Sequence, residues 1–409
     1  MSPRAASESI EMSKTERTNL TVIDLTHGIA GPYCTKLMAG FNANVIKIER
    51  PHGGDLMRSR GPFFQNKPDQ EGSIPFLWLN TGKKSITLNL KSETGCEIFK
   101  RLVRTADIVI ESFSPKVMAG FGLSYSALKE INSRLIMTSI SNFGQYGPYR
   151  DYQAEEIVEY ALSGLMNSTG DPEKAPLCSG PATSQYTAGM VAYVATLMAM
   201  YRKGVNGRGQ YLDISIQECA LDNIEVTLME YLHLGKVAKR SNDRHALVPW
   251  QLYPCRDGYA AVMGGPVRHW LGGADLFEEP RLLEKQFQHM WGRINNREEF
   301  ESLLQPWLNR NGKKEIYHAG QARRLAFGYL ATLPEVLESP QHNARGYFEE
   351  IDHPVTGKQK YCGPPFKLSE TPWRTVRAPL LGEHNEEIYG EFLGYSSAEI
   401  QSLKEDGVI

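Results

Sequence analysis

Cationic side chains recur beside the apolar runs in the first third of the chain. Arg50 follows the run NVIKIE, Lys83 and Lys84 precede SITLNL, and Lys116 ends the segment Ser112–Lys116 that follows DIVIE. Arginine and lysine hold phosphate groups through charge-assisted hydrogen bonds. In open α/β sheets, ligands bind outside the carboxyl ends of the strands. A solvated surface explains any one of these cations, but their recurrence favours a ligand that carries several phosphates.

Three carboxylates lie close together further along the chain. Glu155 and Glu159 are four residues apart, so on a helix they share one face, and Glu156 lies beside them. A solvated helix face accounts for such a group. The functional alternative is a carboxylate that lines a cleft, and the residues alone leave both interpretations open.

The sequence lacks the motifs of several common enzyme classes. It has no GxGxxG and no GxxxxGK[ST] loop, which disfavours hydride transfer with a dinucleotide. It has no HExxH, no GxSxG and no CxxC pair, so we expect no metal site and no serine nucleophile on a nucleophile elbow. The six cysteines are scattered, which is typical of reduced thiols in a cytoplasmic protein.

The elements that must position these groups alternate between strand and helix. Strands are predicted at 20–25, 44–49, 85–90, 107–111, 135–140 and 210–216, and helices at 93–103, 124–131, 153–166, 185–201 and 217–234. This rhythm is typical of a parallel sheet built from βαβ units, which is an α/β fold. A later strand over 259–263 precedes Gly264 and Gly265, which form either a flexible loop or a simple turn.

Length and composition predict two domains. A chain of 409 residues exceeds the size at which a single core stops growing. We expect a disordered tail over 1–18, the first part of a large domain over 19–235 and a smaller α/β domain over 236–330. Proline and glycine become frequent near the end, which indicates a return to the large domain over 331–409.

Charge and hydropathy narrow the choice of partners. The net charge is −2, from 45 Lys and Arg against 47 Asp and Glu, which excludes an overall basic footprint for nucleic acid. The longest apolar run, 188–201, is too short to span a bilayer, and residues 1–18 carry no signal peptide pattern. We therefore expect a cytoplasmic protein with no nucleic-acid or membrane partner.

Several blocks, in the right order, resemble the family III CoA-transferases, the group that includes formyl-CoA transferase, carnitine CoA-transferase and the α-methylacyl-CoA racemases. The strongest blocks are VIDLTHGIAGPYCTKLMAGFNANVIKIERPHGGDLMR, LNTGKKSITLNLK, DIVIESFSPKVMAGFGLSY, TAGMVAYVATLMAMYRKGVNGRGQYLDISIQE and PLLGEHNEEIYGEFLGYSSAEIQSLKEDGVI. The resemblance extends from about residue 20 to residue 409.

The resemblance implies a fold, a ligand and an assembly. The family has a large Rossmann-like domain built from both chain ends, a smaller domain between them, and two chains interlocked like links. It implies acyl-CoA and a carboxylic acid as substrates, with no permanently bound cofactor. It implies that CoA lies along Gly28, Ile29, Arg50, Lys83, Lys84, Ser112 and Phe113, and that a loop at Gly264 and Gly265 covers the site.

The chain also departs from the family it resembles. The family's catalytic aspartate attacks the acyl thioester and forms a mixed anhydride, but the matching position, four residues before Gly189, holds Gln185. A carboxamide cannot form that anhydride. The histidine that the racemases pair with the aspartate is replaced by Glu155, and Ser114 and Gly120 replace two arginines near the CoA phosphates.

Three functions are compatible with these departures. The first is a subunit of a CoA-transferase that lacks the nucleophile and needs an aspartate-bearing partner chain, as in two-subunit members such as benzylsuccinate CoA-transferase. The second is an active enzyme that uses Glu155 or Glu156 as a relocated carboxylate. The third is a non-catalytic protein that binds CoA thioesters. The first is favoured, because one chain of an interlocked dimer can lose its nucleophile and still complete its partner. The dimer would form with a second copy or with a homologous chain.

Overall fold

The computed structural model describes residues 20–224, 226–240, 247–265 and 270–409. In it the chain folds into two compact units. The first unit combines the described residues up to Leu165 with Cys178–Leu228 and Arg345–Ile409, and the second combines Met166–Leu177 with Met229–Ala344. The predicted tail over 1–18 lies outside the described residues, and the predicted boundaries at 235 and 330 stay predictions.

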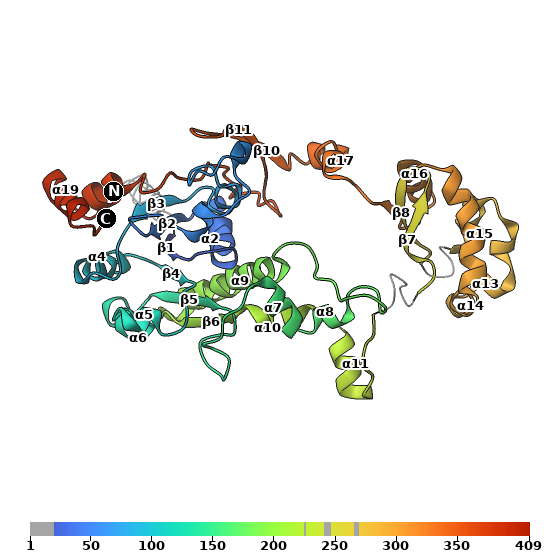
Figure 1. Ribbon diagram of the computed structural model, residues 1–409, viewed down its shortest axis with the longest axis horizontal. Coiled ribbons are helices and arrows are strands. Elements are labelled where there is room, and N and C mark those ends of the chain that lie inside the picture. Colours follow the sequence, from blue (N-terminus) through green and yellow to red (C-terminus); the bar gives the residue numbers. More distant parts are fainter. Residues whose placement is uncertain (1–19, 225, 241–246, 266–269) are drawn as a thin grey trace, which may run out of the picture. The chain divides into compact units, whose positions relative to one another are not determined.

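A six-stranded parallel sheet forms the centre of the first unit (Figure 1). The chain enters at a middle strand, builds toward one edge, crosses back and builds toward the other edge. The prediction of an α/β fold with a Rossmann-like parallel sheet is thereby confirmed. In spatial order the strands are β3 (Lys84–Thr87), β2 (Asn44–Glu49), β1 (Thr21–Leu25), β4 (Ile108–Glu111), β5 (Ile136–Ser141) and β6 (Tyr211–Ser215).

Both faces of this sheet are buried, which explains why its strands read as nearly continuous apolar runs. Successive side chains of a strand point to opposite faces. Along β1, Val22 packs into the core on one face and Ile23 into the core on the other, and neither is exposed to solvent. Ile108 and Val109 of β4 likewise pack into the cores on opposite faces of the sheet.

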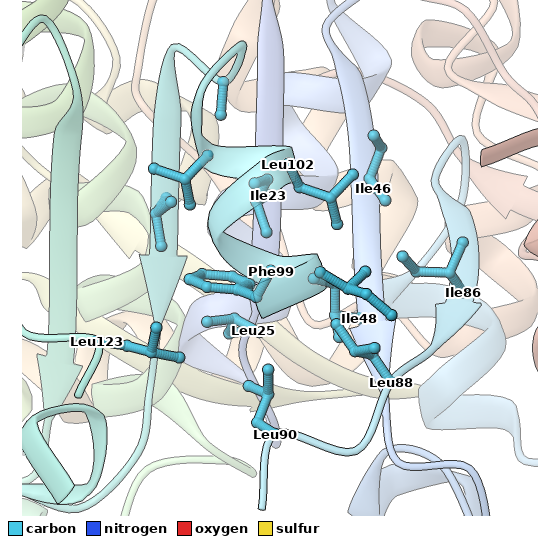
Figure 2. Close-up of a cluster of buried hydrophobic side chains, with 14 of the residues drawn as sticks. Ile23, Leu25, Ile46, Ile48, Ile86, Leu88, Leu90, Phe99, Leu102 and Leu123 are labelled. Carbon is cyan, nitrogen blue, oxygen red and sulfur yellow. The ribbon is translucent and has the colours of Figure 1, made fainter. Parts of the chain in front are cut away.

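One face of the sheet is covered by α4 (Glu93–Val103), as Figure 2 shows. The helix begins after Ser92, whose hydroxyl accepts a hydrogen bond from a backbone N–H of the first turn at 3.0 Å. Phe99 and Leu102 of the helix lie over Ile23 of β1 in the same buried cluster. The predicted bounds of this helix are confirmed.

The opposite face is covered by α2 (Ala30–Gly40) and α9 (Thr183–Asn206), which pack against each other. Gly189 of α9 lies directly against α2. A Cβ atom at this position would be 2.5 Å from the carbonyl oxygen of Ala30. Only glycine permits so close an approach of the two helix backbones.

The end of the chain returns to the first unit beside β3. The His384 N–H donates to the Ser85 carbonyl at 2.9 Å, and the Tyr389 hydroxyl donates to the Thr87 carbonyl at 2.5 Å. The Thr87 N–H donates to the Asn385 side chain at 2.9 Å. The large unit is therefore built from both ends of the described chain. The helices that follow this contact are the π-helix Glu386–Phe392 and α19 (Ser397–Glu405), which join the apolar core under α4.

The second unit has its own antiparallel sheet, formed by β7 (Trp250–Cys255), β8 (Gly258–Met263) and β9 (Gly328–Tyr329). The helices α15 (Arg297–Arg310) and α16 (Lys313–Ala322) pack against this sheet. The predicted strand over 259–263 is confirmed. The sequence did not predict β7, because the nearby prolines argue against a strand.

The predicted single helix over 217–234 is wrong. The structure has α10 (Ile216–Leu221), a 3-10 turn over Asp222–Ile224 and a separate helix, α11 (Val226–Leu234). The Asn223 side chain donates to the Cys219 carbonyl at 3.0 Å. An asparagine that binds the preceding turn in this way competes with the continuing helix ladder.

The remaining elements are short. In the described part of the chain, no helix combines the length and the apolar character needed to cross a membrane. These elements are α3 (Ile74–Leu79), α5 (Val117–Gly120), α6 (Tyr125–Ile131), α7 (Glu156–Leu162), α8 (Leu165–Ser168), α13 (Lys285–Gln288), α14 (Met290–Asn295), α17 (Leu333–Leu337), α18 (Pro340–Ala344) and the hairpin of β10 (Phe348–His353) and β11 (Gly357–Cys362).

Candidate active site

A cavity of about 130 Å³ opens where the strand order reverses between β1 and β4. Its walls come from the segments that follow β1, β4, β5 and β6, and from the first turn of α9. The carboxyl ends of parallel strands at such a reversal are the usual ligand position of this fold. The polar lining residues include His27, Ser112, Ser141, Asn142, Asp151 and Gln185.

A hydrogen bond joins the loops after β1 and β4. The His27 N–H donates to Ser112 Oγ at 2.8 Å, and the His27 ring lies 5.5 Å from the Phe113 ring. The Phe113 N–H donates to Glu111 Oε2 at 2.8 Å. Burial raises the pKa of the Glu111 carboxyl to about 7. Two of the predicted CoA-binding residues, Ser112 and Phe113, thus line this cavity.

A second cavity, of about 280 Å³, lies beside the first and shares His27 and Phe113 with it. Arg50, at the end of β2, lines this second cavity, and its Nε donates to the Gly54 carbonyl at 3.1 Å. Phe121 and Ile48 give the cavity an apolar wall. The two cavities together form a row along the carboxyl edge of the sheet.

Lys83 does not lie on the surface, as a phosphate-binding lysine would. Its side chain is fully buried, and its ammonium group donates to Asp24 at 3.0 Å, to the Pro32 carbonyl at 3.0 Å and to Asn80 at 2.8 Å. Burial lowers the pKa of Lys83 to about 8, against the attraction of Asp24. Lys83 therefore holds the interior together rather than facing either of these cavities.

Lys84 and the glycine after β1 occupy different surroundings. Lys84 is partly exposed and pairs with Glu387 of the chain end at 2.5 Å. Gly28 has a φ of +75°, a conformation that favours glycine, and no described atom lies within 4 Å of where its Cβ would be. Ile29 packs beside Phe76 and Leu77 in a small apolar cluster.

Gln185 lies in the first turn of α9 and lines the first cavity. Its Nε2 donates to Glu159 Oε2 at 2.7 Å. Its backbone N–H donates to Glu156 Oε2 at 3.2 Å, and the Ser184 N–H donates to Glu156 Oε1 at 2.9 Å. Glu156 therefore caps the amino end of α9, where backbone N–H groups lack helical partners.

The spacing predicted that Glu155 shares a helix face with Glu159, and this prediction is wrong because Glu155 is not part of the helix. It lies before α7 in an extended conformation, and its largely exposed side chain pairs with Arg60 at 3.3 Å. The predicted helix over 153–166 was too long at both ends, because α7 spans only Glu156–Leu162. The carboxyl group that contacts the Gln185 side chain is instead that of Glu159, which the sequence analysis grouped with Glu155 and Glu156 but did not name as a catalytic candidate.

Gly264 and Gly265 follow β8 in the second unit. The Gly264 N–H donates to the Pro249 carbonyl at 2.9 Å, and Gly265 has a φ of +59°. The Gly265 carbonyl accepts a hydrogen bond from the buried Arg293 at 3.4 Å. Hydrogen bonds to Pro249 and Arg293 thus fix the start of this segment, and residues 266–269 lie outside the described residues.

Comparison with known proteins places the chain in a family. A family model described as CoA-transferase family III matches residues 18–385. Among curated proteins, the formyl-CoA:oxalate CoA-transferase of Streptomyces coelicolor is 32% identical over 95% of this chain and 98% of its own. The human succinyl-CoA:glutarate CoA-transferase is 30% identical over 95% of this chain and 88% of its own. The chain belongs to CoA-transferase family III.

Solved structures agree with this assignment. A CAIB/BAIF family protein from Brucella suis superposes with a TM-score of 0.81 at 29% identity, covering 91% of this chain and 98% of that chain. The Rv3272 protein of Mycobacterium tuberculosis superposes with a TM-score of 0.79 at 25% identity, covering 90% and 98%. The family resemblance expected from the sequence blocks is confirmed, and with it the CoA-transferase class.

Proposed function

We propose that this chain binds a CoA thioester along the two cavities and serves as the subunit of a CoA-transferase whose nucleophile lies on an aspartate-bearing partner chain. The observation that carries the proposal is Gln185. It lines the first cavity where the family resemblance expects the aspartate, and its carboxamide is held by Glu159.

The row of two cavities suits an extended ligand. The second cavity combines an apolar wall with Arg50, which fits a nucleotide base and its phosphates. The first cavity is smaller and more polar, and it fits the thioester end. The predicted CoA-binding residues Arg50, Ser112 and Phe113 line this row. Lys83 is instead buried in the interior, where it pairs with Asp24.

The carboxylates near Gln185 are poorly suited to replace an aspartate nucleophile. Glu155 is paired with Arg60 on the surface. Both oxygens of Glu156 already accept backbone hydrogen bonds from α9. An attack on a thioester needs a free carboxylate oxygen within reach of the acyl carbon. These contacts support the subunit reading over an active enzyme with relocated Glu155 or Glu156.

An exposed apolar stripe on α9 supports a partner chain. Val194, Leu197, Met198 and Tyr201 follow helical spacing and are 51%, 40%, 68% and 81% exposed. Large exposed apolar patches mark interaction surfaces. The proposed occupant is a second family III chain, either another copy or a homologue, in the interlocked arrangement that the family resemblance implies.

Trapping of the acyl intermediate tests the subunit reading. Chains purified together from the native source are incubated with an acyl-CoA donor, treated with hydroxylamine, and analysed by intact mass. We expect the hydroxamate only on a partner chain that carries aspartate at the position of Gln185. A hydroxamate on Glu155 or Glu156 of this chain would overturn the proposal in favour of relocated chemistry.

The third reading, a protein that binds CoA thioesters without turnover, gives a different result. In that case no co-purifying family chain would be found, and no hydroxamate would form on any chain. Titration of acetyl-CoA against the purified chain separates this result from a failure of the CoA site itself.

A further inference from the structure

A buried carboxyl group meets the carboxamide of Gln185 away from the cavity. Glu159 lies on α7 and Gln185 on α9, and Gln185 Nε2 is 2.7 Å from Glu159 Oε2. Glu159 is not exposed to solvent at all, and its second oxygen, Oε1, has no hydrogen-bond partner among the described residues. A buried, half-satisfied carboxyl group is costly and calls for an explanation.

The charges around Glu159 favour its neutral form. Burial raises the pKa of its carboxyl to about 7, and the neighbouring charges of Glu156 and Glu155 act in the same direction. Against these, the hydrogen bond from Gln185 favours the ionised form. On α10, which packs against α7, the ionisable side chains are Glu218, which is exposed, and Cys219, which is buried.

We propose that Glu159 is a positioning residue for Gln185, so that residues 159 and 185 act as a coupled pair. The Glu159 carboxyl holds one Nε2–H of the carboxamide. This leaves the second Nε2–H of Gln185 to donate to the acyl carbonyl of a bound thioester, which is then held rather than attacked. The ligand assignment rests on the proposed function, whereas the pairing of Glu159 with Gln185 does not.

The coupled pair has a consequence for any attempt to restore the nucleophile. An aspartate at position 185 would place a second carboxyl beside Glu159, in a site that has no cation in contact with Glu159 among the described residues. Two adjacent carboxyls share a proton, and one of their pKa values rises strongly. Gln185→Asp alone would therefore leave a group that is partly protonated and poorly nucleophilic near neutral pH.

Thermal unfolding across pH 5.5–8.5 tests the coupling of residues 159 and 185 in the full chain. The variants are Gln185→Asp, Glu159→Gln and the double variant. In Gln185→Asp the folded pair binds more protons than the unfolded chain, so stability falls as pH rises. We expect the Tm deficit of Gln185→Asp against the parent to grow by about 2–4 °C over this range, and the deficit of the double variant against Glu159→Gln to stay constant.

The control variant is Glu218→Gln, which removes an exposed carboxyl of α10. Combined with Gln185→Asp, it should leave the growth of the deficit unchanged. If Glu159→Gln also leaves that growth unchanged, residues 159 and 185 are uncoupled and the proposal is wrong. This readout does not depend on any ligand.

A binding measurement tests the positioning role. Glu159→Ala should weaken acetyl-CoA binding about fivefold, the equivalent of one neutral hydrogen bond, and leave the affinity for free CoA unchanged. Glu159→Gln retains an acceptor and should preserve the affinity for acetyl-CoA. Equal affinities of Glu159→Ala and the parent for acetyl-CoA would overturn the positioning role. If the parent binds neither CoA nor acetyl-CoA, the proposed function fails, while the unfolding result still decides whether the two residues are coupled.

Discussion

At the scale of single residues, the structure separates two kinds of cation that look alike in the sequence. Arg50 lies on the surface at the end of β2 and lines a cavity, whereas Lys83 is buried against Asp24. The sequence places both beside strand-like runs. The difference arises because Asp24, a buried charge in the middle of β1, needs a cation as its partner.

Arg50 carries a prediction for CoA binding. Arg50→Ala should weaken CoA binding by about 1.5 kcal/mol, the lower end for a hydrogen bond to a charged group, because Arg50 is exposed to solvent. This corresponds to a roughly tenfold rise in Kd in a calorimetric titration. Lys129→Ala removes an exposed lysine of α6 that lines neither cavity, and it is the matched control. Equal Kd values for Arg50→Ala and Lys129→Ala would place the phosphates elsewhere.

At the scale of elements, the packing of α2 against α9 depends on Gly189. Gly189→Ala would bring a Cβ to 2.5 Å from a backbone oxygen, so the helices must separate. We expect a loss of about 1–3 kcal/mol in unfolding free energy, measured with urea. Gly204→Ala, in the same helix but with no described atom within 4 Å of the new Cβ, should gain about 0.5–1 kcal/mol. A Gly189→Ala variant as stable as the parent would show that the two helices adjust freely.

Strands and helices of the parallel sheet were predictable because both signals are local. The strand-like run NVIKIE predicted the bounds of β2, and the helical spacing over 93–103 predicted those of α4. The site was less predictable, because it depends on contacts between distant segments. The pairing of Glu159 with Gln185 joins two residues that are 26 positions apart in sequence, and it leaves no local pattern. The break after α10 depends on the side chain of Asn223, and a hydropathy pattern carries no information about such a hydrogen bond.

At the scale of the whole molecule, the exposed stripe of α9 predicts an assembly. Met198→Lys places a charge within this stripe, where Met198 is 68% exposed. We expect the parent to elute above its monomer mass of 45.9 kDa in size-exclusion chromatography with light scattering. Met198→Lys should shift it toward the monomer, because burial of an unpaired charge is costly.

The control for this assembly prediction is an exposed apolar residue that is not part of the stripe. Leu333 of α17 is 81% exposed, so Leu333→Lys should leave the elution of the parent unchanged. A monomeric parent, or an unchanged mass on Met198→Lys, would contradict the role of the stripe.

The contact of the chain end with β3 has a consequence for synthesis on the ribosome. Strand β3 lies at an edge of the sheet, and its partners at Asn385 and Tyr389 follow it by about 300 residues. At translation speeds of about 5–20 residues per second, those partners emerge about 15–60 s after the strand. For that interval the edge keeps unpaired backbone groups, which attract other strands. A segment made about 300 residues later therefore closes this edge of the sheet.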